Sequence, residues 1–381
     1  MTIVNIDDLR LAARRRLPKL FFDYIDGGSF AEETYRRNRD DFSLLRLRQN
    51  VLKDYAEPDL STEYLGRRHP LPFMLGPVGF LGLYTRNGEQ KAAIAAHAAG
   101  IPFCLSTFSI ASLADLRSAT DGALHFQLYV LDDRTLCEEF LSAAEEADVE
   151  ALYVTVDTAI TAIRERDVRN GFRSLTHITP RLFASLCRKP AWLFDVGRGG
   201  MPSVRAVEHR TDFGRGALEQ AANLSRRIDK KLAWKDIEAL RDRWKGKLVI
   251  KGILSPEDAT KAQAVGVDGI VVSNHGGRQL DGAMSTIAAL PDIRSAVGPD
   301  FTLMLDGGVR RGSDIVKAIG LGADGVMLGR AYTYGLAAAG QAGVDRAIET
   351  LRREISITLA LMGVGSIADL KERGSHLILK Q

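Results

Sequence analysis

The run SNHGGRQLDGA at residues 273–283 brings a histidine and an arginine close together, directly after the apolar stretch DGIVV. An imidazole can accept a proton near neutral pH, and a guanidinium can hold a carboxylate with two parallel hydrogen bonds. Taken alone, His275 after an asparagine is more often a turn or capping residue. The side chains at the ends of the other apolar stretches therefore decide whether this run belongs to a catalytic site.

Two further apolar stretches end in groups that can do chemistry. VTVD ends with Thr155 and Asp157, which lie on one face of a strand because they are two residues apart. LVIK ends with Lys251, and Ser273 stands two residues before His275. A lone lysine at a strand end usually meets solvent, but independent solvated ends would not bring Asp, Lys, His and Arg to one edge. We therefore expect a single catalytic site.

Two turns rich in glycine and arginine predict a phosphate site. DGGVRRGSD (306–314) and LGRAYTYG (328–335) each place glycine and arginine where a strand gives way to a helix. Glycine lets backbone N–H groups approach an anion, a helix N-terminus favours negative charge, and arginine adds a forked donor. The three cysteines, Cys104, Cys137 and Cys187, lack metal-ligand spacing. We therefore expect the phosphate to belong to an organic cofactor, and we expect no metal.

Short apolar stretches that alternate with helical segments must position these groups. The stretches expected as strands are 72–77, 102–107, 124–130, 151–157, 247–252, 268–274, 301–308 and 324–329. Continuous apolar strands separated by helices predict a parallel sheet buried on both faces. Eight such units favour a closed (β/α)8 barrel, or TIM barrel, whose active site lies at the carboxyl ends of its strands. No G-x-G-x-x-G follows the first strand, which argues against a dinucleotide-binding fold.

Two segments fall outside this α/β repeat. Residues 1–65 are expected to form a helical N-terminal extension, with a natural helix stop at Gly27–Gly28. Residues 160–230 form a loop insertion after the fourth strand that is far longer than a usual connection. Its part from 160 to 215 holds 11 Lys and Arg against 5 Asp and Glu. We expect the whole chain, 1–381, to form a single catalytic domain.

Composition is that of an ordinary enzyme. The chain has 381 residues, of which 45% are hydrophobic and 26% charged, and its net charge is +3. That charge is too small to indicate a nucleic-acid partner. No stretch has the length of a signal-peptide core or a membrane span, and three cysteines are too few for a disulfide scaffold. These features predict a cytoplasmic protein.

Four motifs together carry a family resemblance. SNHGGRQLDGA, DGGVRRGSDIVKAIGLGADGVMLGR, FQLYV and VTVDT resemble the FMN-dependent L-2-hydroxy acid oxidase/dehydrogenase family. WKDIEALRDRW, VIKGILSPEDA and AGQAGV are most similar to its bacterial L-lactate dehydrogenase branch, whereas RERDVRNGF and GGMP are similar to its (S)-mandelate dehydrogenase branch. The resemblance covers nearly the whole chain. It implies FMN as the cofactor and oxidation of an L-2-hydroxy acid, L-lactate or similar, to the 2-oxo acid.

The family pattern implies catalytic roles for four matching residues. His275 would be the base, removing either the C2 proton or the hydroxyl proton as hydride leaves. Asp157 would hydrogen-bond the imidazole and stabilise its protonated form. Tyr129 would hydrogen-bond the substrate hydroxyl, and Lys251 would stabilise the negative charge that reduced flavin develops near N1.

The pattern also implies which residues hold the substrate and the cofactor. Arg278 would bind the substrate carboxylate, helped by the phenol of Tyr24 and the positive charge of Arg164. The residues that would bind FMN are Pro77, Val78 and Gly79 along the ring, Ser106, Gln127, Thr155 and Lys251 at its polar edge, Ser273 and Asp306 at the ring or ribityl chain, and Gly307, Gly308, Arg310, Gly329 and Arg330 at the phosphate.

Two positions bear on the preferred substrate and electron acceptor. Glycolate-type oxidases of the family usually have alanine where this chain has Gly79, so the glycine favours a quinone or other acceptor over O2. Phe108 stands where the mandelate branch has a small residue, so its ring favours L-lactate and other short hydroxy acids. An (S)-mandelate dehydrogenase and an oxidase that uses O2 stay open as alternatives.

The resemblance extends to partners. In the related dehydrogenases the corresponding loop approaches the membrane, so segment 171–215 is expected to make peripheral contact with the cytoplasmic face of the inner membrane. The residues expected there are Phe183, Leu186, Trp192 and Phe194 among Arg181, Arg188, Lys189 and Arg198. A mobile lid or an oligomer interface is the alternative for this loop. A homo-oligomer, a tetramer by analogy, is also expected.

Two rival functions remain. A phosphate-binding barrel isomerase or lyase would use the glycine–arginine turns for its substrate, and would leave FQLYV and Lys251 without a purpose. A non-catalytic protein that keeps FMN for stability or sensing would not need His275, Asp157 and Arg278 together.

Overall fold

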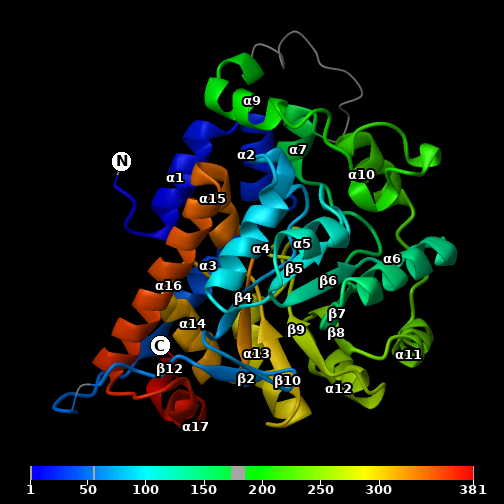
Figure 1. Cartoon of the computed structure of the whole chain (residues 1–381). Helices are drawn as coiled ribbons and strands as arrows, with labels where there is room; N and C mark the ends of the chain where they lie inside the picture. The colour runs from blue at the N-terminus through cyan, green and yellow to red at the C-terminus, as the bar shows by residue number, and fades with distance from the viewer. Residues whose placement is uncertain (1, 55, 173–184, 381) are drawn as a thin grey trace.

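The computed structural model describes residues 2–54, 56–172 and 185–380. Its parallel strands form a closed barrel in the order β10-β11-β4-β5-β6-β7-β8-β9 (Figure 1). Pairing of β11 with β4, with Val326 opposite Phe73, closes the ring. The barrel strands are β4 (Phe73–Leu75), β5 (Phe103–Ser106), β6 (Leu124–Leu128), β7 (Ala151–Thr155), β8 (Lys247–Ile253), β9 (Gly269–Val272), β10 (Thr302–Leu305) and β11 (Gly325–Leu328). The expected TIM barrel is confirmed, and each strand coincides with an apolar stretch expected for it.

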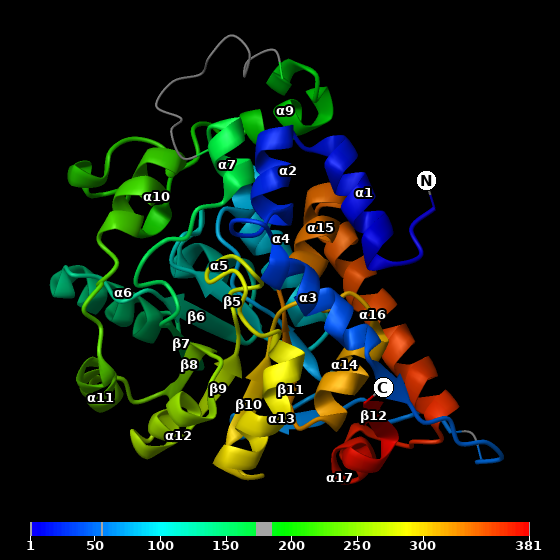
Figure 2. The same cartoon turned by 180° about the vertical axis from the view of Figure 1, so that it is seen from behind.

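Helices follow the barrel strands and cover the outside of the ring (Figures 1 and 2). They are α4 (Gly88–Ala98), α5 (Leu113–Ala119), α6 (Arg134–Glu146), α12 (Pro256–Ala264), α13 (Thr286–Val297), α14 (Gly312–Gly320), α15 (Arg330–Ala339), α16 (Gln341–Met362) and α17 (Ile367–Leu377). Several start at serine N-caps: Ser112, Ser255 and Ser285 each accept a backbone N–H from the first helical turn.

Side chains inside the barrel determine which residues reach its mouth. Tyr153 points inward and donates its hydroxyl to the sulfurs of Met74 and Met304, at 3.5 Å each. Because side chains alternate along a strand, the next inward position on β7 is Thr155. Val249 is likewise inward on β8, which makes Lys251 the next inward residue. The apolar interior therefore delivers two polar groups to the carboxyl end of the ring.

The N-terminal extension is helical only over its first two thirds. It forms α1 (Ile6–Arg16), α2 (Lys19–Asp26) and α3 (Glu33–Ser43), and α1 lies beside α15 and α16 (Figure 1). The prediction of helix as far as residue 65 is wrong, since β1 (Leu45–Leu47) pairs with β12 (Ile378–Lys380) and β2 (Thr62–Tyr64) pairs with β3 (Arg67–His69). Strand β1 pairs with residues at the far end of the chain, so no local sequence pattern predicts it.

The insertion after β7 contains short helices. Among its described residues they are α7 (Glu165–Asn170), α9 (Pro190–Gly197), η2 (Arg205–Val207), η3 (Thr211–Phe213) and α10 (Ala217–Arg226), and α11 (Trp234–Arg243) follows the insertion before β8. In Figure 1, α9 lies above α2 at the top of the molecule, and α10 lies to the right of α9. The insertion therefore borders the carboxyl end of the barrel, where the site is expected.

One residue expected at a membrane surface is buried instead. Trp192 has 5% of its surface exposed, packs on Phe21 with ring centroids 5.2 Å apart, and donates its indole N–H to the carbonyl of Leu83 at 2.8 Å. This tryptophan anchors α9 to the barrel, because an indole ring that finds both an apolar neighbour and an acceptor is best satisfied inside. Phe183 and Arg181, expected in the same group, lie outside the described residues.

Candidate active site

The carboxyl end of the barrel encloses a cavity of about 480 Å³, within the usual range for a cofactor or small-molecule site. Most of the residues predicted from sequence line it: Tyr24, Pro77, Val78, Gly79, Ser106, Gln127, Tyr129, Thr155, Arg164, Lys251, His275, Arg278, Asp306, Gly307, Gly308, Arg310, Gly329 and Arg330. Two do not. Asp157 and Ser273 lie one layer behind, where they contact His275 and Lys251.

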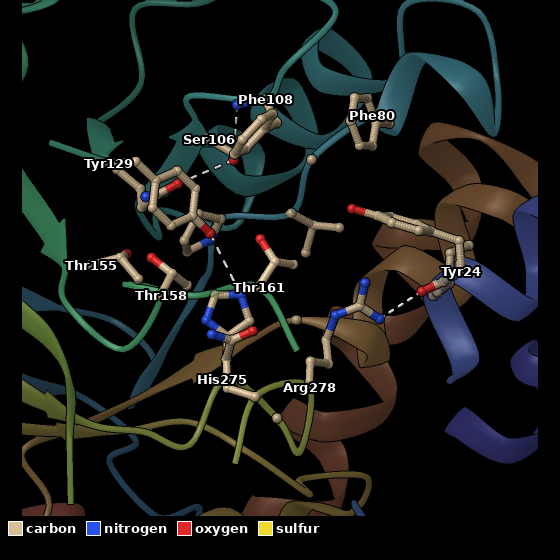
Figure 3. A pocket seen from close by; sticks show the side chains of 18 of the residues that line it. Tyr24, Phe80, Ser106, Phe108, Tyr129, Thr155, Thr158, Thr161, His275 and Arg278 are labelled. Carbon is tan, nitrogen blue, oxygen red and sulfur yellow. Dashed lines mark hydrogen bonds between the residues drawn. The ribbon is translucent and has the colours of Figure 1, made fainter. Parts of the chain in front are cut away.

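His275 lies between a carboxylate and a phenol. Its Nδ1 is 3.0 Å from Oδ1 of Asp157. Its Nε2 is 3.5 Å from the hydroxyl of Tyr129, as Figure 3 shows. The carboxylate accepts the Nδ1 proton, which leaves Nε2 of the neutral ring as the acceptor toward the cavity. The backbone φ of His275 is +58°, a conformation rare outside glycine, and it turns the side chain back over the barrel mouth.

The electrostatic surroundings suit this histidine to accept a proton. Burial lowers the pKa of His275 below its usual value, although Asp157 acts in the opposite direction. Burial would raise the pKa of Asp157, but the nearby His275 and Lys251 hold it below its usual value. At neutral pH the pair is therefore a neutral imidazole beside an ionised carboxylate. That arrangement can take up a proton and stabilise the imidazolium that results.

This pair predicts a pH dependence. Protonated His275 cannot accept a proton, so the rate of substrate oxidation should fall as pH drops through its pKa, which lies below the ordinary histidine value of about 6.5. In Asp157→Asn the carboxylate that favours the protonated ring is gone, so the acid limb of kcat/KM should move to still lower pH. The plateau rate should also fall, by about 10²-fold, because imidazolium is no longer stabilised. If the acid limb of kcat/KM does not move in this variant, Asp157 does not influence the pKa of the base.

Lys251 carries a buried positive charge at the cavity wall. Its ammonium donates to Oγ of Ser273 at 2.8 Å and pairs with Oδ2 of Asp306 at 2.6 Å. Burial opposes the charged form, but the carboxylates of Asp306 and Asp157 outweigh it and raise the pKa of Lys251. The residue is therefore a fixed cation, and Ser273 positions it from behind instead of reaching the cavity as expected.

The opposite end of the cavity is suited to an anion. Gly307 and Gly308 have φ values of +96° and +80°, and their backbone lines the cavity beside Arg310. Arg310 is 5% exposed, forms no ion pair among the described residues, and has a buried Nε without a hydrogen-bond partner. A buried guanidinium without a counter-charge calls for an anion, and a phosphate would supply it.

Arg330 lines the cavity and also holds neighbouring backbone. Its guanidinium donates at 2.8 Å to the carbonyls of Ile25, Gly276 and Gly27, which ties α2 and the loop of His275 to α15. These bonds use three of its five N–H donors, so two stay available for an anion. Position 330 can also offer a phosphate its backbone N–H in the first turn of α15, after the N-cap Gly329.

Several buried polar atoms of this wall have no partner within the described chain. They include Nε2 of Gln127, Oγ1 of Thr155 and Oδ1 of Asp306. The other amide atom of Gln127, Oε1, accepts the hydroxyl of Ser106 at 3.1 Å. Unsatisfied buried polar groups are costly, so they indicate a bound group that completes them. A planar ring with amide-like edges beside Lys251 and a phosphate beside Arg310 fits this donor set, and FMN has both parts.

Arg278 is placed to bind an acid. Its guanidinium lies 4.8 Å from the centre of the Tyr24 ring, and Nη1 donates to the carbonyls of Tyr24 and Gly27 (Figure 3). It pairs with no carboxylate in the described ranges, although it lines the cavity next to His275. Arg164 lies over the same tyrosine ring at 5.7 Å. Arg164 has Asp167 as its counter-charge at 3.9 Å, so Arg278 is the guanidinium on this side that can take up a further carboxylate.

Aromatic rings complete this side, and of these only Phe108 was singled out from the sequence. Phe172 stacks on Tyr24 with centroids 4.3 Å apart, and Phe80 lies 5.6 Å from Tyr24. Phe108 lies 5.2 Å from Tyr129, and a Cβ added to Gly79 would come within 3.1 Å of the Phe108 side chain. Gly79 therefore leaves room for the ring that narrows the cavity. No spacing announces this group, because its members come from separate loops.

Gln279 was missed for a similar reason. Its Nε2 donates to the carbonyls of Asp157 at 2.7 Å and Ile160 at 3.0 Å, so it ties the loop after β9 to the loop after β7. It stands in the run SNHGGRQLDGA, and its position four residues after His275 is the only signal that could have found it.

Taken together, the barrel and its mouth define a class of protein: a TIM-barrel oxidoreductase whose cavity suits a phosphate-bearing planar cofactor beside a buried histidine and an arginine without a carboxylate partner among the described residues. The model of the family of FMN-dependent dehydrogenases matches residues 13–377. The chain belongs to the FMN-dependent dehydrogenase family. It is an oxidoreductase whose cofactor is FMN.

Relatives and solved structures agree with this assignment. The chain is 45% identical over 379 residues to an L-lactate dehydrogenase of Caulobacter vibrioides, which covers 98% of this chain and 97% of the relative. It is 44% identical to an L-lactate dehydrogenase of Serratia proteamaculans, with 97% of both chains covered. Among solved structures, the monotopic membrane protein (S)-mandelate dehydrogenase superposes with a TM-score of 0.95 at 38% identity over 100% of both chains.

Proposed function

We propose that the protein oxidises L-lactate, or a 2-hydroxy acid of similar size, to the 2-oxo acid. One observation supports it above the others: Arg278, without a carboxylate partner among the described residues, faces the same cavity as a neutral His275. A carboxylate held by the guanidinium brings the adjacent carbon and its hydroxyl within reach of an imidazole that can accept a proton. The L-lactate dehydrogenases at 44–45% identity support the same substrate class.

Each residue has a defined task in this reaction. Arg278 binds the substrate carboxylate through the donors that its bonds to backbone leave available. Tyr129 donates to the substrate hydroxyl, since burial raises the pKa of its phenol and keeps the proton in place. His275 takes up the substrate proton at Nε2, and Asp157 stabilises the imidazolium. The Nδ1 hydrogen bond keeps the ring in the required tautomer.

The cofactor end of the cavity completes the chemistry. FMN, when bound, would take up the two electrons and the second proton that the substrate loses as its C–OH carbon becomes a carbonyl. Gly308, Arg310 and the first turn of α15 would hold its phosphate, and Gln127 and Thr155 would satisfy the polar edge of its ring. Lys251 presents a fixed positive charge to that edge, where it favours the reduced, more negative form.

The spectrum of the purified protein tests this proposal. The protein is recorded under anaerobic conditions before and after addition of L-lactate, and the flavin absorbance band is expected to bleach. A band that persists with L-lactate but bleaches with (S)-mandelate would keep the reaction and overturn the substrate size. A protein without a flavin band, even after FMN is added, would support the rival phosphate-binding barrel enzyme.

Phe108 predicts the size limit of the substrate. Its ring lies against Tyr129 and opposite Phe80, at centroid distances of 5.2 and 6.1 Å, on the wall that a substituent at C2 would meet. Phe108→Ala should raise kcat/KM for (S)-mandelate relative to L-lactate by about 10-fold or more, as expected for a change of one to three kcal/mol in pocket fit. The ratio of the two constants is the measurement. If the ratio does not rise, a ring other than that of Phe108 limits the size of the substrate, and Phe80→Ala is the matched variant that tests the ring of Phe80.

The proposal also covers the electron acceptor and the location of the protein. Within the described chain, no helix has the length and hydropathy needed to cross a bilayer. On α9 and its flank, Leu193, Phe194 and Met201 are exposed, and Arg198 lies 3.8 Å over the Phe194 ring. Exposed apolar residues beside cations suit the surface of an anionic membrane. Together with the monotopic neighbour, they support peripheral association and a membrane quinone as electron acceptor.

A further inference from the structure

The turn that carries the base is strained and must be held by its neighbours. His275 has φ +58°, and Gly276 and Gly277 follow at +64° and +74°, so three successive residues are left-handed. Glycine tolerates this region, but a residue with a side chain stays there only where the surroundings over-determine it. The contacts that fix this turn therefore decide where the imidazole points.

Asn274, directly before the base, helps to close the turn. Its backbone carbonyl and its Oδ1 both accept the N–H of Gly277, at 3.1 Å each, and its Nδ2 donates to the carbonyl of Met284 at 3.0 Å. These bonds span the loop from one side of His275 to the other. With 6% of its surface exposed, the amide depends on the protein for its hydrogen bonds.

Asn274 is held in turn by a residue from the N-terminal extension. Asn38, in the middle of α3, forms a reciprocal amide pair with it, with Nδ2 to Oδ1 distances of 2.8 Å in both directions. Oδ1 of Asn38 also accepts the N–H of Thr286 at 3.3 Å, at the start of α13. Asn38 is 2% exposed and does not line the cavity.

Other residues of α3, and residues just before it, also contact the loop that carries His275. Ser29 donates its N–H to the carbonyl of Gly277 at 2.9 Å, and Thr34 donates its hydroxyl to the carbonyl of Leu280 at 3.2 Å. The helix also touches the anion-binding turn, since a Cβ on Gly308 would lie 1.8 Å from the carbonyl oxygen of Asn38. One helix therefore supports both the base loop and the phosphate end; in Figure 2 it lies in front of the barrel, between α2 and α14.

We propose that Asn38 is a positioning residue for the proposed reaction: through its amide pair with Asn274 it fixes the turn so that Nδ1 of His275 meets Asp157 while Nε2 faces the cavity. The inference rests on the proposed function, because it takes His275 as the base. It assigns Asn38, which does not line the cavity, a part in catalysis through its contact with Asn274.

The kinetic test uses Asn38→Leu, which keeps the side-chain size but removes both bonds to Asn274 and the weaker bond from the N–H of Thr286. A shift of about 1 Å in a reacting group can lower a rate by about 10²-fold, so single-turnover reduction of the flavin by L-lactate should slow by about 10- to 100-fold. The Kd for L-lactate should stay within about threefold, because Arg278 is bound to other backbone groups. Asn50→Ala is the matched control: it removes an amide bond to the carbonyl of Met362, away from the cavity, and should leave the rate unchanged.

A double-mutant cycle separates positioning from general loss of structure. If Asn38 acts through Asn274, Asn38→Leu should change the rate by less than about twofold in an Asn274→Leu background. Independent, multiplicative effects would overturn the proposal. If the leucine variant does not fold, Asn38→Ser replaces it in the same cycle with the same expectations, because serine puts a smaller polar group, a hydroxyl, in place of the amide.

A titration gives a readout that does not need turnover. The groups that face His275 are Asp157 after β7, Lys251 on β8, Arg164 before α7 and Tyr129 after β6. If Asn38→Leu turns the imidazole away from Asp157, the pKa of His275, followed by NMR of labelled histidine, should fall. An unchanged pKa with full FMN content would overturn the positioning role, whatever the substrate is. Failure of every hydroxy acid to bleach the wild-type flavin would instead overturn the proposed function alone.

Discussion

Replacing His275 with glutamine is expected to slow flavin reduction by L-lactate by about 10⁴-fold, the upper end of what a general base contributes. Glutamine keeps hydrogen-bonding capacity but cannot accept a proton near neutral pH. FMN should stay bound, because the groups suited to its phosphate and ring edge, such as Arg310 and Gln127, belong to other strands and loops. Stopped-flow absorbance under anaerobic conditions measures the rate, and the bound flavin is quantified from the same spectrum.

The left-handed backbone at position 275 requires a second variant. Asparagine tolerates a φ of +58° better than glutamine does, so His275→Asn separates the loss of the base from added backbone strain. His97→Gln, at an exposed histidine of α4, is the matched control and should behave as wild type. Reduction within about tenfold of the wild-type rate in both variants at position 275 would mean that another group removes the proton.

Replacing Arg278 with methionine is expected to lower kcat/KM for L-lactate by about 10³-fold. Two hydrogen bonds to a carboxylate, each stabilising by about 1.5–3 kcal/mol, correspond to about 10²- to 10⁴-fold in affinity. The methionine can still pack on the Tyr24 ring, which lies 4.8 Å from the guanidinium in the wild type. The fold and the bound FMN should therefore survive. Steady-state kinetics with L-lactate measures the loss.

The sharper measurement for Arg278 is selectivity. Wild-type protein should prefer L-lactate strongly over the uncharged L-lactamide, whereas Arg278→Met should lose most of that preference. Arg278→Lys restores a positive charge without the fork and should recover only part of it. Arg36→Met, at an exposed arginine of α3, is the control and should keep the wild-type ratio. A preference for the acid that persists without Arg278 would assign carboxylate binding to another cation, for which Arg164→Met is the next variant.

The main features of the site could be predicted from the sequence because they are local. Buried parallel strands need continuous apolar runs, so the eight strands and their carboxyl ends are written in short stretches of chain. The residues that follow those ends, such as Asp157, Lys251 and His275, converge in any barrel with this strand order. Glycine before a helix likewise marks an anion-binding turn wherever the rest of the chain lies.

What the sequence did not predict depends on partners far away along the chain. Trp192 is of a type suited to a membrane surface, but it is buried because Phe21 and the carbonyl of Leu83 come from other segments. Arg330 is of a type suited to phosphate, but three backbone carbonyls from other segments take three of its five N–H donors. Neither competitor can be identified from neighbouring residues.

By itself, then, the sequence determined the barrel, the side chains at its mouth and the kind of cofactor they suit, since each follows from local polarity and strand order. Only the tertiary structure decided how those side chains are held. The left-handed turn at His275 is fixed by an amide pair between Asn38 and Asn274 that joins residues 236 positions apart. A strained local conformation persists only when distant contacts enforce it, and contacts at that separation come into being when the chain folds.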